Sequence, residues 1–240
     1  DFLDYAYNLH LPVDFVSVHP YPASYPVTDI TGHSIYRTKN ATIEDLNKIR
    51  QVVKNSHYQN AEIDLTEWSS TPKIHDYQHD SLAAADYILR SISGSENLVD
   101  ALSYWVFTDI FEEFRNRDAA FHGGFGLLTF QGIRKPAFHA YKFLNTLGDL
   151  AIKRTNDYIV SKNKKTGSIS LIAWNYPADV NTAIANFQSL DVLKKFETSG
   201  SIRLVKLDIS NLEPGQTFIC ELLEYNHGYS LPTWEQMGQP

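Results

Sequence analysis

Cysteine is almost absent from this sequence. The 240 residues contain one, Cys220, so the chain can form no internal disulfide and no metal site built on several thiolates. A lone cysteine is compatible with the cytoplasm and also with a secreted protein that lacks disulfides, so the cellular location stays unknown. The sequence opens at Asp1 with no initiator methionine and no signal-peptide pattern, which we interpret as a trimmed piece of a longer protein.

Long apolar runs and an excess of positive charge are also lacking. No apolar run approaches the roughly 20 residues that a membrane-spanning helix needs, so we expect no membrane association. The 28 acidic residues outnumber the 21 Lys and Arg, and the net charge of −7 argues against binding to nucleic acid, which depends on clustered basic residues. A neutral or small polar substrate fits this balance better.

The first part of the chain, residues 1–148, alternates apolar runs with amphipathic patterns. A loop rich in Pro and Tyr follows the first run, and strand, helix, strand, helix, strand, helix is the order typical of parallel βαβ units. Three strands are too few for a closed (β/α)₈ barrel, so this part is either a small open sheet or the last portion of a truncated barrel. The patterns predict buried strands over 13–19, 61–67 and 101–107, and helices over 42–56, 80–93 and 136–147.

The second part, residues 149–240, has a different pattern. Short apolar stretches alternate with turn signals such as Lys164-Lys165-Thr166-Gly167 and Glu213-Pro214-Gly215-Gln216. This pattern predicts a small antiparallel β domain, a β-sandwich. Its expected strands are 158–161, 169–175, 203–209 and 217–225.

Polar and aromatic residues lie at the end of each predicted parallel strand. His19 ends the first and Tyr21 lies two residues beyond it, Glu67 ends the second, and Trp105 lies near the end of the third. Taken singly, each has an ordinary explanation: a salt-bridged surface carboxylate, a hydrogen-bonded structural histidine, a core indole. Active sites of (β/α)₈ enzymes are built at the C-terminal strand ends, so the joint placement favours a functional site.

Metal binding has little support in the sequence. His75 and His79 are four residues apart, near Asp76 and Asp80. We interpret them as part of a solvated loop and helix start rather than as zinc ligands. No metal and no cofactor are therefore predicted.

Five sequence motifs together resemble the β-xylosidases of glycoside hydrolase family 39. The resemblance extends to the C-terminal motifs His227-Gly228-Tyr229 and Trp234-Glu235-Gln236-Met237-Gly238, so it covers nearly the whole chain and is weakest between about 178 and 201. The five motifs are DFVSVHPYP at 14–22, LTEW at 65–68, SYWVFTDIFEE at 103–113, FHGGFGL at 121–127 and KPAFHAY at 135–141.

The resemblance implies that the three strands are the sixth, seventh and eighth of a (β/α)₈ TIM barrel. Glu67 then matches the family's catalytic nucleophile, and the resemblance assigns no role to residues 149–240 beyond an accessory domain. The implied substrate-binding residues are His19 and Tyr21, which hold the nucleophile and the sugar, Trp105 and Phe107 on the aromatic side of the site, and Glu112 and Glu113, which grip sugar hydroxyls.

The implied reaction is a retaining hydrolysis of β-linked xylose from xylo-oligosaccharides or xylosides. Such hydrolysis needs two carboxyl groups about 5–5.5 Å apart. In the resembling family the second belongs to an Asn-Glu pair, and no Asn in this sequence is followed by Glu. We therefore expect the acid/base upstream of Asp1, and expect this fragment alone to hydrolyse little or nothing. The open edge of its sheet predicts self-association that would cover it.

Two alternatives stay open at this point. The chain could be a non-catalytic carbohydrate-binding fragment that holds a sugar without cleaving it. It could also derive from a related arabinosidase or α-L-iduronidase. An iduronidase needs basic groups for the uronate carboxylate, and Glu112 with Glu113 near the sugar makes a neutral pentose the more plausible ligand.

Overall fold

The computed structural model of the chain describes residues 2–28, 30, 34–111, 119–175, 189–198, 210 and 214–239. Glu112, Glu113 and the predicted strand 203–209 lie outside the described residues. Within the described ranges, no helix is both long enough and apolar enough to span a bilayer.

A three-stranded parallel sheet forms the first part of the molecule, as the sequence predicted. Its strands are β1 (Phe15–Val18), β4 (Glu62–Trp68) and β5 (Ala101–Tyr104), in the order β1-β4-β5. Helix α2 (Ala41–Lys54) lies between the first two strands in the chain, and α3 (Leu82–Gly94) between the last two. Two consecutive βαβ units result, with the predicted helices confirmed to within a few residues.

One face of this sheet is open. β4 buries Ile63, Leu65 and Trp68, whereas no residue of β1 or β5 is fully buried, and Phe15 on β1 is 55% exposed. The prediction of three buried strands was therefore wrong for the outer two. Parallel strands have continuous apolar sequences when both faces of their sheet are covered. Within the described chain, helices cover only one face of this sheet, and β1 and β5 each pair with a neighbour on one side only.

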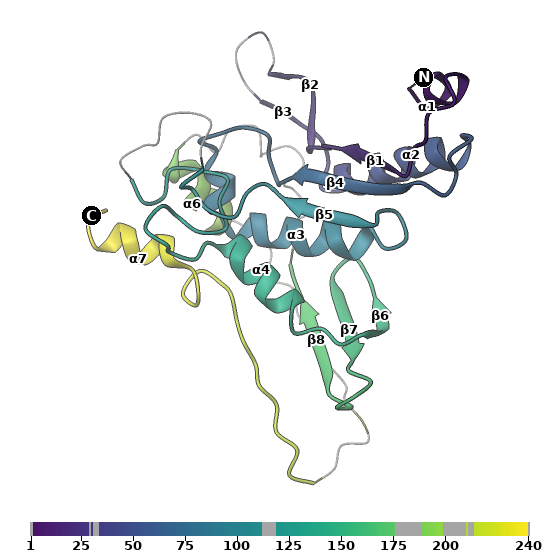
Figure 1. The fold of residues 1–240 in the computed structure, drawn as a ribbon. Coiled ribbons are helices and arrows are strands. Elements are labelled where there is room, and N and C mark those ends of the chain that lie inside the picture. Colours follow the sequence, from purple (N-terminus) through teal and green to yellow (C-terminus); the bar gives the residue numbers. More distant parts are fainter. Residues whose placement is uncertain are drawn as a thin grey trace.

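Two N-terminal features were not predicted. Helix α1 (Phe2–Asn8) precedes the sheet, and the loop rich in Pro and Tyr contains an antiparallel pair, β2 (Ala23–Thr28) with β3 (Ser34–Tyr36). In Figure 1 this pair extends away from the parallel sheet.

Helix α3 is the centre of the molecule and is buried on nearly every side, as a helix between two packed layers must be. It packs against α4 (Pro136–Leu144), which begins with the predicted N-terminal proline. At its other end, Ser93 Oγ donates to the carbonyl of Thr155 at 2.7 Å. This bond ties α3 to the turn between the first two strands of the C-terminal sheet (Figure 1).

The C-terminal sheet has three antiparallel strands in chain order. They are β6 (Leu150–Arg154), which was not predicted, β7 (Tyr158–Lys162) and β8 (Ile169–Ala173). The predicted strand at 217–225 is wrong: the segment runs extended without a strand neighbour in the described chain, and Phe218 and Ile219 are 64% and 95% exposed. A β-strand forms only where the backbone of a neighbouring strand supplies hydrogen bonds, and the alternation of apolar and polar side chains within one segment does not guarantee such a neighbour. The second sheet of a sandwich stays a prediction.

Three short elements lie near the N-terminal end of α3. They are the 3₁₀ helix η1 (Tyr77–Asp80), α6 (Leu190–Thr198) and α7 (Ser230–Gln236). The ring of Trp234 on α7 packs 5.4 Å from that of Phe121. His79, which lies in η1, is almost completely buried, so its expected place in a solvated loop or helix start was wrong, whereas His75 is partly exposed.

Candidate active site

Glu67 lies near the C-terminal end of β4 and is contacted by two side chains from beyond the end of β1. The hydroxyl of Tyr21 donates a hydrogen bond to Glu67 Oε1. His19 Nδ1 lies 3.7 Å from Oε2 of the same carboxylate. The Glu67 side chain is 23% exposed, so it is partly shielded and still open to a ligand. Three residues far apart in the sequence therefore meet at one carboxylate.

The sheet register explains this convergence. Val18 is paired with Leu65 in the parallel β1–β4 ladder, so the residues that follow them, His19 and Thr66, are neighbours at the same edge of the sheet. The C-terminal ends of parallel strands share one edge, and the side chains that continue them meet there. The placement predicted from strand ends is thus produced by ordinary parallel pairing.

A threonine that the sequence analysis did not single out fixes the histidine. The Thr66 hydroxyl lies 2.9 Å from His19 Nε2 and 2.6 Å from Ser17 Oγ. With Nε2 occupied by Thr66, the imidazole is oriented so that Nδ1 turns toward Glu67. Side chains alternate along β1 and β4, and the register of the two strands places Ser17, His19 and Thr66 together on the open face. Thr66 could have been found from this alternation once the register of the two strands was assumed.

The aromatic side of the site follows β5. Trp105 donates its backbone N–H to the carbonyl of Trp68 at 2.9 Å, which places it at the neighbouring strand end. Its ring meets Phe111 edge to face at 5.4 Å, and Phe107 is 62% exposed. An exposed ring at the strand end next to that of a partly exposed carboxylate suits the apolar face of a sugar. The contribution expected of Glu112 and Glu113 stays a prediction, because both lie outside the described residues.

Asp76 and Asp80, the first two carboxylates after β4, do not supply a second catalytic carboxyl at this edge. Asp76 is buried and accepts hydrogen bonds from the Thr71 hydroxyl and the Gln78 backbone N–H. Asp80 is fully buried and forms an ion pair with Lys135. Both carboxylates are therefore buried and bound to other groups of the chain.

A buried ion cluster behind the site was missed by sequence reasoning. The Lys135 ammonium lies 2.7 Å from Asp80 Oδ1 and 2.7 Å from Asp109 Oδ2, and all three side chains are fully buried. Burial lowers the pKa of Lys135, but the two neighbouring carboxylates outweigh it and raise that pKa above its usual value. A lysine directly before the Pro136 that begins an apolar helix was the one available hint.

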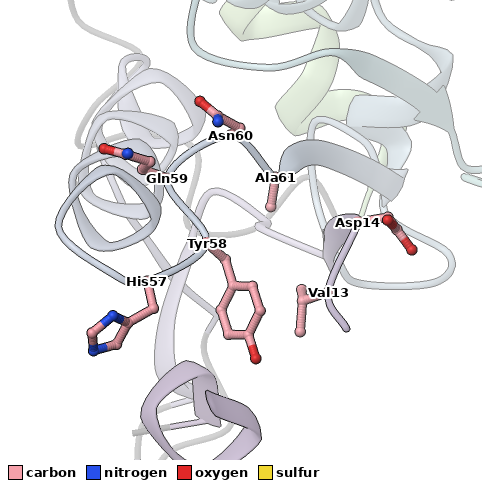
Figure 2. Close-up of a pocket in the computed structure, with 7 residues that line it drawn as sticks. All are labelled: Val13, Asp14, His57, Tyr58, Gln59, Asn60 and Ala61. Atoms are coloured by element: carbon pink, nitrogen blue, oxygen red, sulfur yellow. The ribbon is translucent and has the colours of Figure 1, made fainter. Parts of the chain in front are cut away.

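A cavity of about 310 Å³ lies elsewhere, at the N-terminal ends of β1 and β4. Figure 2 shows Gln59 and Asn60 pointing to one side and Asp14 to the other, so these polar side chains do not converge on a shared centre. The His57 ring is instead stacked on Tyr7 at 3.5 Å. The described residues contain no group of three or more His, Cys, Asp or Glu placed to hold a metal ion.

Comparison with known proteins places this geometry in context. The family described as Glycosyl hydrolases family 39 matches residues 1–240. The chain is 31% identical over 244 residues to a β-xylosidase of Geobacillus stearothermophilus, covering 100% of this chain and 45% of that protein.

Two solved structures are similar in fold. The GH39 enzyme from Xanthomonas axonopodis pv. citri superposes with a TM-score of 0.67 at 32% identity, over 75% of this chain and 37% of that one. A monomeric β-xylosidase from Caulobacter crescentus gives a TM-score of 0.74 at 26% identity, over 100% of this chain and 48% of that one. The chain thus spans less than half the length of each relative.

Proposed function

This chain belongs to glycosyl hydrolase family 39, and from that membership we propose that the protein of which it is part is a retaining β-xylosidase with Glu67 as its nucleophile. The observation that carries the proposal is the contact of Tyr21 and His19 with the Glu67 carboxylate. A partly exposed carboxylate that is held in place by a phenol and an imidazole is oriented for attack on a bound sugar.

The family membership also supports a proposal for the fold of the whole protein. We infer that residues 1–148 are the sixth to eighth βα units of a (β/α)₈ barrel, and that residues 149–240 form an accessory β-sandwich domain. The parallel order β1-β4-β5, its open inner face and the similarity to family 39 structures support the barrel assignment. The antiparallel sheet β6-β7-β8 would be one layer of the sandwich.

In the proposed reaction, a Glu67 oxygen attacks the anomeric carbon of a β-linked xylose. The bond from that carbon to the leaving oxygen breaks, and an acid protonates the leaving group. Water activated by the same residue, now a base, then displaces Glu67 and restores the β configuration. We expect this acid/base from residues outside these 240, because the sequence has no Asn-Glu pair and because Asp76 and Asp80 are buried with other partners.

The remaining roles follow from position. His19 and Tyr21 would hold Glu67 and contact the sugar, and Trp105 with Phe107 would form an aromatic wall. Glu112 and Glu113 are proposed to bind sugar hydroxyls. The substrate would be a xylose-containing oligosaccharide or a xyloside.

The test uses the full-length protein that carries these residues and an aryl β-xyloside with a good leaving group, which needs little acid catalysis. Glu67→Gln is expected to lower kcat by about 10⁴-fold or more, because the nucleophile is lost. Glu62→Gln, an exposed glutamate at the start of the same strand, is the matched control and should retain activity.

A 2-deoxy-2-fluoro-β-xyloside with a good leaving group provides a direct readout. Mass spectrometry of the peptide that contains Glu67 should show one added fluorosugar if this residue is the nucleophile. Full activity of Glu67→Gln, or labelling of another carboxylate, would contradict the assignment. Turnover of arabinosides but not xylosides would change the substrate and keep the family.

A further inference from the structure

The buried cluster of Lys135, Asp80 and Asp109 joins three segments that surround the candidate site. Asp80 ends η1, which follows the strand of Glu67; Asp109 follows β5; and Lys135 directly precedes α4. The lysine ammonium contacts one oxygen of each carboxylate at 2.7 Å and donates to the carbonyl of Gly124 at 2.9 Å. Its three contacts therefore join the segments of the two aspartates to the loop that contains Gly124.

The second oxygen of each carboxylate binds backbone. Asp80 Oδ2 accepts from the N–H of Gly123, and Asp109 Oδ1 accepts from the N–H of Gly126, both at 2.7 Å. Each aspartate thus links the same lysine to the segment 123–126. These links define the geometry of that segment at two separate points.

The segment that Asp109 ends also carries Trp105 and Phe107. Residues 106–109 form a ladder of backbone hydrogen bonds with 125–128, including Val106 N–H to the Phe125 carbonyl at 3.1 Å and Asp109 N–H to the Leu128 carbonyl at 2.9 Å. A Cβ at Gly126 would lie 2.4 Å from the backbone nitrogen of Asp109, so the two backbones touch. Any movement of Asp109 is therefore transmitted to the aromatic residues a few positions earlier.

Stability alone does not account for this arrangement. Burying three charges costs more than packing apolar groups in the same space, and buried ion clusters can often be replaced by apolar residues with no loss of stability. A cluster with fixed hydrogen-bond directions does restrict its segments to one geometry, which apolar contacts do less strictly.

We propose that Lys135, through Asp109, is a positioning residue that fixes the aromatic side of the sugar site, Trp105 and Phe107, relative to Glu67. The role in sugar binding rests on the proposed function, whereas the positioning of Trp105 does not. In this role Lys135 and Asp109 touch no substrate and act only through the segment that they hold.

The decisive variant is Asp109→Asn in the full-length protein. It keeps an oxygen for the Gly126 N–H but points an amide toward the lysine in place of a carboxylate. The KM for an aryl β-xyloside is expected to rise roughly tenfold or more, with a smaller change in kcat, because small displacements of binding groups have large effects. The ¹⁹F resonance of Trp105 in 5-fluorotryptophan-labelled protein, identified through Trp105→Phe, is expected to shift.

Asp100→Asn is the matched control. Asp100 lies at the opposite end of β5 and also accepts from a backbone N–H, that of Ile63, and from a cation, Arg50, both at 2.8 Å. Loss of the Asp100 carboxylate should lower the thermal stability and leave both KM and the Trp105 resonance unchanged.

Two further outcomes are separable. If Asp109→Asn does not fold, the neutral triple variant Lys135→Met, Asp80→Asn, Asp109→Asn keeps both glycine N–H acceptors and undergoes the same measurements. If the wild type hydrolyses no glycoside, the proposed function fails while the ¹⁹F shift still tests positioning. An unchanged Trp105 resonance in the folded variant would overturn the proposal, as would an unchanged KM in an active one.

Discussion

Tyr21 shows how one hydroxyl can organise the candidate site. It donates to Glu67 Oε1, while His19 approaches the other carboxylate oxygen and is itself held by Thr66. The carboxylate is thereby fixed from two sides without being fully buried. Orientation of a nucleophile in this way lowers the reorganisation required in the reaction.

Removal of that hydroxyl gives the first residue-scale prediction. A hydrogen bond to a charged group contributes about 1.5–3 kcal/mol, so Tyr21→Phe should lower kcat/KM roughly 10- to 100-fold on an aryl β-xyloside. Tyr5→Phe removes the same hydroxyl from an exposed tyrosine of α1 and should have no effect. Equal activity of both variants would mean that Tyr21 does not orient Glu67.

At the level of elements, α6 caps the start of α3. The N-cap residue Ser81 makes no side-chain cap, and Glu197 Oε1 on α6 instead accepts the Leu82 N–H at 2.9 Å. Burial raises the pKa of Glu197 to about 7, although the bonds from Leu82 and Tyr229 oppose that rise. The central helix is therefore attached to the C-terminal elements by a group that titrates near neutrality.

This attachment predicts a pH dependence of stability. Because the pKa of Glu197 is higher in the folded chain than its ordinary value of 4.5, its contribution is complete below about pH 4.5 and is lost as pH rises through 7. Between pH 5 and pH 8 the loss should be about 2 to 3 kcal/mol of unfolding free energy.

Urea unfolding at the two pH values measures the effect. Glu197→Gln should reduce the difference in unfolding free energy between pH 5 and pH 8, and exposed Glu62→Gln should leave it as in the wild type. A pH dependence that persists in full in Glu197→Gln would assign it to other groups, of which Asp86, with a pKa raised by burial to about 7, is the first to test.

For the whole molecule, the open parallel sheet is the dominant feature. β1 and β5 are its edges in the described chain, and Phe15 on β1 is exposed, as are Phe2 and Tyr5 on α1. Unpaired edges with apolar neighbours favour pairing with another chain. The remaining strands of the proposed barrel would pair with these two edges and curve round the open face.

We therefore predict that the 240-residue chain, produced alone, associates in a concentration-dependent manner. Phe15→Lys places a charge at the β1 edge and should increase the monomer fraction measured by light scattering after size exclusion. Val52→Lys makes the same type of change at a similarly exposed site on α2 and should not. If the chain is monomeric at all concentrations, the exposed edges of its parallel sheet do not pair with another copy.

The sequence by itself determined the local and repetitive features. Apolar periodicity predicted the parallel strands and the helices between them, and strand ends predicted that His19, Tyr21 and Glu67 would meet, because parallel pairing brings those ends to one edge. The motifs at these ends were sufficient to identify the family.

Only the tertiary structure decided which side chains and strands found partners. The sequence patterns did not predict burial of Asp80, Asp109 or Lys135, and they predicted a solvated loop for His79, yet all four are buried because segments distant in sequence pack over them. Conversely, 217–225 has the alternation of a strand, yet in the described chain it joins no sheet and has only an isolated bridge at Glu224. Burial and pairing are properties of what surrounds a residue, and periodicity within one segment does not contain that information.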